Sequence, residues 1–107
     1  MAEPRKVMAA LALACLVVRG AVAADADVRS VDVEGMSFAP QVIEVRAGEK
    51  IVWRNKDLVP HTVTAAGAFD SRSIAPGASW SHRFDKPGEF EYVCSFHPGM
   101  KGRVIAK

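Results

Sequence analysis

The chain has 107 residues, half of them hydrophobic, which is enough for one domain at most. Its formal net charge is +2 at pH 7, and without residues 1–24 it carries 11 basic and 11 acidic residues. The charge of the whole chain therefore says nothing about partners, and the balance removes long-range electrostatic steering as a clue to them; we expect no nucleic-acid partner.

Residues 1–24 have the three-part organisation of a secretory signal peptide. Basic residues precede an apolar run over residues 7–18, and small residues with an A-x-A-like pattern follow it. The run has 12 residues, whereas a membrane-spanning helix needs about 20. We therefore predict cleavage after Ala23 or Ala24 and a mature domain over residues 25–107, exported to the periplasm without stable membrane association.

The two cysteines are expected to differ in their fate. Cys15 lies inside the apolar run, with further apolar residues after it, which argues against an acylated lipoprotein cysteine. It therefore leaves with the signal peptide. Cys94 is then the only thiol of an exported domain, where an unpaired cysteine is at risk of oxidation or intermolecular pairing. We expect a ligand to occupy it.

The mature part carries the period of two that is typical of β-strands. Apolar and polar residues alternate in segments 31–33, 43–45, 51–53, 63–65, 80–84, 90–94 and 102–106. Turn sequences rich in Gly, Pro, Asn and Asp separate these segments. No convincing helical period follows the signal peptide. The pattern predicts an all-β fold, a small antiparallel β-sandwich with Trp53 and Trp80 in its core.

The motif CSFHPGM, residues 94–100, places a thiol, an imidazole and a thioether at intervals of three residues. Cys94 ends a predicted strand, and Pro98 with Gly99 favours a loop before the final strand. A second imidazole, His61, begins another predicted strand 33 residues upstream of Cys94. Neighbouring strand ends could bring this imidazole beside the loop.

Soft donors narrow the choice of metal at such a site. Thiolate and thioether are soft and imidazole suits copper, zinc, iron and nickel, whereas calcium and magnesium require oxygen donors. Structural zinc uses Cys and His and has little use for Met. Two His, one Cys and a weak axial Met form the trigonal blue-copper arrangement. Copper therefore fits best the four candidate ligands His61, Cys94, His97 and Met100.

Each candidate ligand also has a simpler explanation when it is considered alone. Cys94 and Met100 could be core residues, and His61 a surface imidazole. Their joint spacing, in an exported domain with one thiol, favours the metal site. His82 is not expected to be a ligand, because a trigonal site with a cysteine needs only two imidazoles.

Two longer stretches, FAPQVIEVRAGEKIVWRNKDLVPHTV and YVCSFHPGMKGRVIA, resemble the cupredoxin family, and within it the amicyanins. The resemblance covers about residues 28–107. The two residues between His97 and Met100, and Pro98 directly after the histidine, match the short ligand loop of that group. The resemblance implies a Greek-key cupredoxin fold and the copper ligands His61, Cys94, His97 and Met100. It further implies that Asn55 bridges by hydrogen bond to the ligand loop at Ser95.

Two positions depart from the amicyanin pattern. Gly99 stands where a bulky aromatic residue is usual, so the surface around His97 is less bulky and partner identity does not transfer. His82 replaces a usually apolar core residue, which is expected to cost stability. Met36 is expected in the core or beside the ligands. The following charged residues are interpreted as solvated surface: Lys50, Arg54, Lys56, Asp57, Asp85 and Lys86.

Four ligands around one ion leave no position open for a substrate, which argues against an enzyme. A fragment of a copper oxidase or nitrite reductase would need His-x-His pairs, which the sequence lacks. We therefore expect a monomeric, periplasmic blue-copper electron carrier that contacts a redox donor and acceptor transiently near His97. The alternative is an envelope copper-binding or copper-delivery protein that uses the same donors without a redox role.

Overall fold

The computed structural model describes residues 27–107. The predicted signal peptide, residues 1–24, lies outside the described residues. No helix within residues 27–107 is long and apolar enough to cross a membrane. The described part instead consists of nine strands. They are β1 (Val28–Glu34), β2 (Ser37–Ala39), β3 (Val42–Val45), β4 (Lys50–Asn55), β5 (Thr64–Ala65), β6 (Phe69–Asp70), β7 (Ser79–Arg83), β8 (Gly88–Cys94) and β9 (His97–Ala106).

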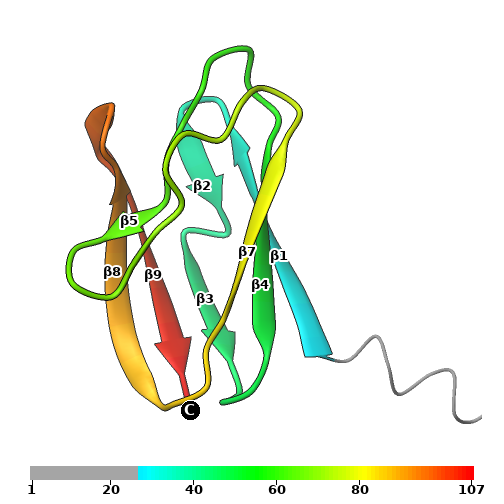
Figure 1. The fold of residues 1–107 in the computed structure, drawn as a ribbon, viewed down its shortest axis with the longest axis vertical. Coiled ribbons are helices and arrows are strands. Elements are labelled where there is room, and N and C mark those ends of the chain that lie inside the picture. Colours follow the sequence, from blue (N-terminus) through cyan, green and yellow to red (C-terminus); the bar gives the residue numbers. More distant parts are fainter. Residues whose placement is uncertain (1–26) are drawn as a thin grey trace, which may run out of the picture.

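The strands form two sheets that face each other, with the orders β2-β1-β4-β7 and β3-β9-β8-β5-β6 (Figure 1). The predicted all-β sandwich is therefore confirmed. The sheets are nevertheless mixed, since β1 pairs with β4 in parallel and β3 pairs with β9 in parallel. The chain passes from the first sheet to the second between β2 and β3 and returns before β4. Strands β1 and β4 are thus neighbours without being joined by a hairpin.

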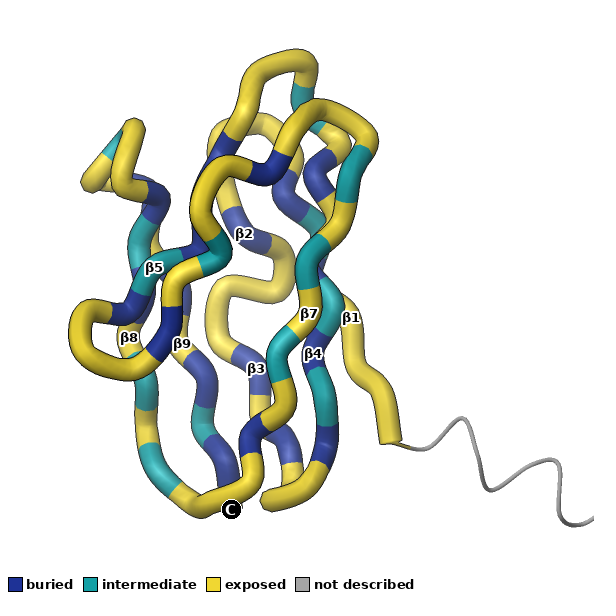
Figure 2. The backbone as a smooth tube through the Cα atoms, in the orientation of Figure 1, coloured by how far each residue is buried: buried dark blue, intermediate teal, exposed yellow. Residues whose placement is uncertain are grey.

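The core lies between the two sheets, where alternate residues of the long strands are buried (Figure 2). Trp53 of β4 is fully buried at its centre, and its Nε1–H donates a hydrogen bond to the Tyr92 hydroxyl at 3.1 Å. Phe38 packs edge-on against Tyr92, with ring centroids 4.7 Å apart. Trp80 of β7 is half-buried and packs against this core. The predicted core role of Trp53 is confirmed, while Trp80 lies at the margin.

His82 occupies the same margin as Trp80. Its ring is stacked on Trp80, with a centroid distance of 5.6 Å and an interplanar angle of 13°. It also lies 4.9 Å from the ring of Phe69 and 5.0 Å from that of Phe84. Burial lowers the pKa of His82, and the Asp85 carboxylate opposes this shift. A half-buried position at the edge of the sheet therefore tolerates an imidazole where an apolar residue is usual.

Candidate metal centre

Strand ends at one pole of the sandwich position the predicted ligands. His61 precedes β5 and pairs with Ile74 in an isolated bridge, Cys94 is the last residue of β8, and His97 is the first of β9. Cys94 and His97 face each other across a turn of only two residues. The loop expected over residues 94–100 is therefore shorter, because β9 already begins at His97. Met100 lies within β9 and is buried.

His61 and Cys94 form the buried part of the centre. Both residues are fully buried, and the Nδ1 atom of His61 lies 3.7 Å from the Sγ atom of Cys94. Nitrogen and sulfur donors at about 2.1 and 2.3 Å from one metal ion, separated by an angle of about 120°, lie about 3.8 Å apart. The observed separation thus fits two ligands that share one ion.

His97 completes the group from the solvent side. Its ring centroid is 5.7 Å from that of His61, at an interplanar angle of 63°, and the residue is half-buried. These contacts place Cys94 and His97 each beside His61, while within residues 27–107 no three His, Cys, Asp or Glu side chains already stand as a closed ligand group. Met100 is buried and follows His97 by three residues in β9, and an odd separation along a strand does not by itself put two side chains on one face. His82 contacts the aromatic rings of Phe69, Trp80 and Phe84 instead, in agreement with its exclusion as a ligand.

The surroundings of Cys94 favour its thiolate. Burial raises the pKa of this thiol, but hydrogen bonds from the backbone of Thr62, Phe96 and His97 act in the opposite direction, and the pKa is lowered. The Thr62 N–H donates to Sγ at 3.3 Å. Because the thiolate is the form that binds metal ions, the site is prepared for a cation.

Asp57 corrects one interpretation of the sequence, since it is not part of a solvated surface. Its side chain is 15% exposed, and its Oδ2 atom lies 2.7 Å from Nε2 of His61. The carboxylate also accepts the backbone N–H groups of Gly35 at 2.7 Å and Met36 at 3.0 Å. Both residues have positive φ angles, 63° and 60°, which turn the two donors toward one point.

These contacts decide which nitrogen of His61 is free. Burial raises the pKa of Asp57. Hydrogen bonds from the backbone of Met36 and Gly35 and from the side chain of His61 lower the pKa by more than burial raises it, so the group stays a carboxylate. A carboxylate accepts the Nε2–H of the imidazole, which leaves the Nδ1 lone pair directed toward the metal position. Met36 is 43% exposed rather than in the core, and its backbone supports Asp57.

Asn55 corrects a second expectation. Its Nδ2 atom donates to the carbonyl groups of Val59 and Ile74, both at 2.9 Å, and its Oδ1 atom accepts the Asp57 N–H at 3.0 Å. The implied bridge to Ser95 is therefore wrong. Thr62 makes that contact, because its Oγ1 atom accepts the Ser95 N–H at 2.8 Å. The sequence motif supplied the four candidate ligands, but no pattern in it pointed to Asp57 or Thr62.

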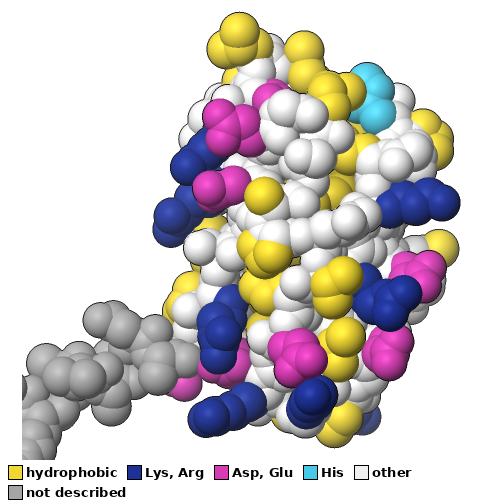
Figure 3. All heavy atoms as spheres, turned by 180° about the vertical axis from the view of Figure 1, so that it is seen from behind, with side chains coloured by type: hydrophobic (Ala, Val, Ile, Leu, Met, Phe, Trp, Pro, Cys, Tyr) yellow, Lys and Arg dark blue, Asp and Glu magenta, His cyan; other side chains and the backbone are white. Residues whose placement is uncertain are grey.

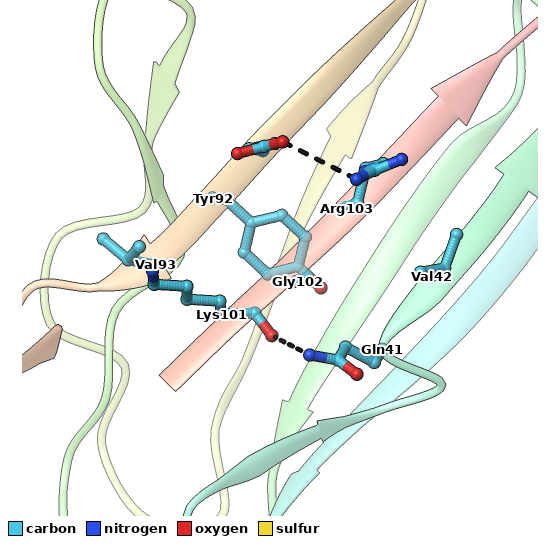
Figure 4. A pocket seen from close by; sticks show the side chains of 8 residues that line it. Gln41, Val42, Tyr92, Val93, Lys101, Gly102 and Arg103 are labelled. Carbon is cyan, nitrogen blue, oxygen red and sulfur yellow. Dashed lines mark hydrogen bonds and ion pairs between the residues drawn. The ribbon is translucent and has the colours of Figure 1, made fainter. Parts of the chain in front are cut away.

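A cavity of about 450 Å³ lies at β8, β9 and the start of β3 (Figure 4). Its lining includes Tyr92, Lys101 and Arg103, but none of the four predicted ligands. Cavity volume therefore does not mark the metal centre, since a single ion held by protein donors needs almost no empty space.

The sequence profile of the cupredoxin-like domain family matches residues 7–106. The chain belongs to the cupredoxin-like family. Among known cupredoxins, it is 28% identical over 88 residues to an amicyanin of Paracoccus versutus, covering 77% of this chain and 67% of that protein. It is 33% identical over 90 residues to a chloroplastic plastocyanin of Tetradesmus obliquus, covering 71% of this chain and 62% of the plastocyanin.

Solved structures of cupredoxins share the fold. The Cu(I) form of an amicyanin variant with a methionine-to-glutamine substitution superposes with a TM-score of 0.73 at 22% identity, covering 76% of this chain and 83% of that chain. The predicted family and fold are thus confirmed. The prediction of a type 1 copper cofactor is confirmed through the family, whose matched members are copper proteins, and the donor set described above fits that ion. The matched relatives are electron carriers rather than enzymes.

Proposed function

We propose that this cupredoxin is a periplasmic carrier of single electrons whose copper ligands are His61, Cys94, His97 and Met100. The 3.7 Å separation of His61 Nδ1 and Cys94 Sγ in a fully buried setting is the observation that carries this proposal. A copper ion held there would supply one-electron chemistry by alternating between Cu(II) and Cu(I).

The protein's own contribution is to keep the donors in place. Asp57 orients His61 from one side, the bridge to Ile74 holds its backbone, and Thr62 donates to the sulfur of Cys94. Donors fixed in this way need little rearrangement when the charge of the ion changes. A small rearrangement is what a fast one-electron carrier requires.

The half-buried His97 is the proposed electron port, because exposed apolar side chains lie at the same pole of the molecule. Leu58 is 93% exposed and Phe96 is 51% exposed, and Val59 is exposed beside Leu58. Figure 3 shows hydrophobic side chains gathered at this pole of the molecule. A small apolar surface suits brief contacts with a redox donor and acceptor, by a carrier that remains monomeric.

The test separates electron transfer from copper delivery. The full chain, expressed with its own leader, should be recovered from the periplasm and should turn intensely coloured with Cu(II) through thiolate-to-copper charge transfer. It should also take up and release one electron reversibly in a redox titration. The variant Cys94→Ser should lose the band. A colourless copper complex would refute the carrier and favour delivery, and a band retained in Cys94→Ser would refute the ligand assignment.

A further inference from the structure

We propose that the surface carboxylate of Asp70 is a positioning residue for the turn between Cys94 and His97, acting through a chain of three hydroxyl groups. The inference rests on the proposed function, because the turn matters only if the two residues share a metal ion. The chain runs from Asp70 in β6 through Thr64 and Thr62 to Ser95.

The contacts along this chain are continuous. The Thr64 hydroxyl donates to Oδ1 of Asp70 at 3.2 Å, and its oxygen lies 2.9 Å from Oγ1 of Thr62. The Thr62 hydroxyl in turn lies 3.0 Å from Oγ of Ser95 and accepts the Ser95 N–H at 2.8 Å. Hydrogen bonds thereby link four side chains in series, and these side chains come from three separate segments of the polypeptide.

The carboxylate fixes the direction of every bond in the series. An ionised carboxylate can only accept, so the single hydroxyl proton of Thr64 is committed to Asp70. Thr64 must then accept the proton of Thr62, and Thr62 must accept that of Ser95. All three hydroxyl protons therefore point toward Asp70. Hydrogen bonds aligned in one direction polarise and strengthen one another.

The far end of the chain lies where the centre needs rigidity. Ser95 is the first of the two residues that separate Cys94 from His97. Thr62 holds both the N–H and the hydroxyl of Ser95, and these two bonds restrain the backbone between two proposed ligands. Thr62 is buried and joins two functions, because its N–H donates to the Cys94 sulfur while its hydroxyl holds Ser95.

The near end of the chain is held in the same way. Oδ1 of Asp70 also accepts the N–H of Arg72 at 2.9 Å, and Arg72 has a positive φ of 62°. This second bond keeps the carboxylate in place although the residue is exposed. A side chain that would otherwise be an ordinary surface charge is thus given a fixed direction toward Thr64.

The experiment breaks the hydrogen-bonded series at Thr64 and at its Asp70 end. Each variant is made in the whole polypeptide, expressed with its own leader. Thr64→Val removes the hydroxyl next to Asp70 and keeps the shape of the side chain, whereas Thr64→Ser keeps the hydroxyl. Asp70→Ala removes the acceptor, whereas Asp70→Asn loses the same charge but retains an acceptor oxygen. Two quantities are measured: amide hydrogen exchange at Ser95 in the metal-free protein, and Cu(I) affinity by competition with a chelator.

We expect Thr64→Val and Asp70→Ala to speed exchange at Ser95 about fivefold, relative to the amides of β4, which corresponds to the loss of about one hydrogen bond. Cu(I) affinity should fall about tenfold, the low end for a residue acting behind the ligands. Thr64→Ser and Asp70→Asn should stay close to the parent protein in both quantities.

The inference is overturned if Asp70→Ala or Thr64→Val leaves Ser95 exchange unchanged, if Thr64→Ser behaves like Thr64→Val, or if exchange rises equally in β4. If the parent protein binds no copper, the proposed function fails, while exchange in the metal-free protein still decides whether Asp70 restrains the turn. The two failures are therefore distinguishable.

Discussion

Gly102 offers the sharpest test of how the sandwich is packed around the metal pole. It faces Tyr92 across β8 and β9, and a Cβ atom at this position would overlap the Cζ and Oη atoms of the tyrosine ring and lie 2.9 Å from Cε1. Figure 4 shows the ring of Tyr92 beside Gly102. The ring is buried, hydrogen-bonded to Trp53 and packed on Phe38, so moving it away from a new Cβ atom would disturb both contacts.

The variant Gly102→Ala should therefore lower the free energy of unfolding by about 1–3 kcal/mol, the usual cost of an overpacked core. For a domain of this size, such a loss lowers Tm by about 5–20 °C. Thermal and urea unfolding of the metal-free protein would measure both values. Gly99→Ala is the matched control, because no atom lies within 4 Å of its added Cβ.

Equal unfolding curves for the two alanine variants would refute this account of the core. Because Tyr92 lies two residues before Cys94 in β8, a displacement of the Tyr92 ring should also move the Cys94 sulfur at the metal centre. A displaced charge-transfer band in copper-loaded Gly102→Ala, with the band of Gly99→Ala unchanged, would show that core packing fixes the position of the sulfur.

Three further predictions concern single side chains. Because burial lowers the pKa of His82 below its ordinary value of 6.5, the unfolded chain binds the proton more tightly, so stability should fall as pH drops below about 6.5. Urea unfolding of the metal-free protein at several pH values should show this slope, and His82→Leu should reduce it. Asp57→Asn replaces the charged partner of His61 by a neutral amide, so copper affinity should fall about 10–100-fold in chelator competition. An unchanged affinity would mean that the carboxylate does not orient the imidazole. Met100→Leu should keep copper bound but change the reduction potential in a redox titration, since the axial ligand tunes it. The same potential in both proteins would exclude an axial role.

Local alternation predicted much of the fold, because one face of nearly every strand is buried. Trp53 and Tyr92 alternate with exposed or half-buried neighbours, and this pattern is visible in the sequence. Alternation carries no information on strand direction, however. The parallel pairs β1–β4 and β3–β9 follow from how the chain crosses between the sheets, which no short segment encodes.

The donor motif was likewise visible in the sequence, whereas the residues that hold the donors were not. Asp57 is removed from the solvent by backbone N–H groups of the β1–β2 turn, 21 and 22 residues earlier in the chain. Thr62 reaches Ser95 across 33 residues. Such contacts depend on the assembled sandwich, so a charged residue in a loop and a threonine shortly before β5 both looked unremarkable in the sequence.

The placement of β9 sets a condition on when the centre can come into being. This strand lies between β3 and β8 in its sheet, and it also carries His97 and Met100. A nascent chain that has not yet reached residue 97 lacks both of these proposed donors and leaves β3 and β8 without their shared neighbour. Metal loading must therefore follow synthesis of nearly the whole domain, and if the polypeptide is threaded unfolded through a membrane, loading must follow translocation too.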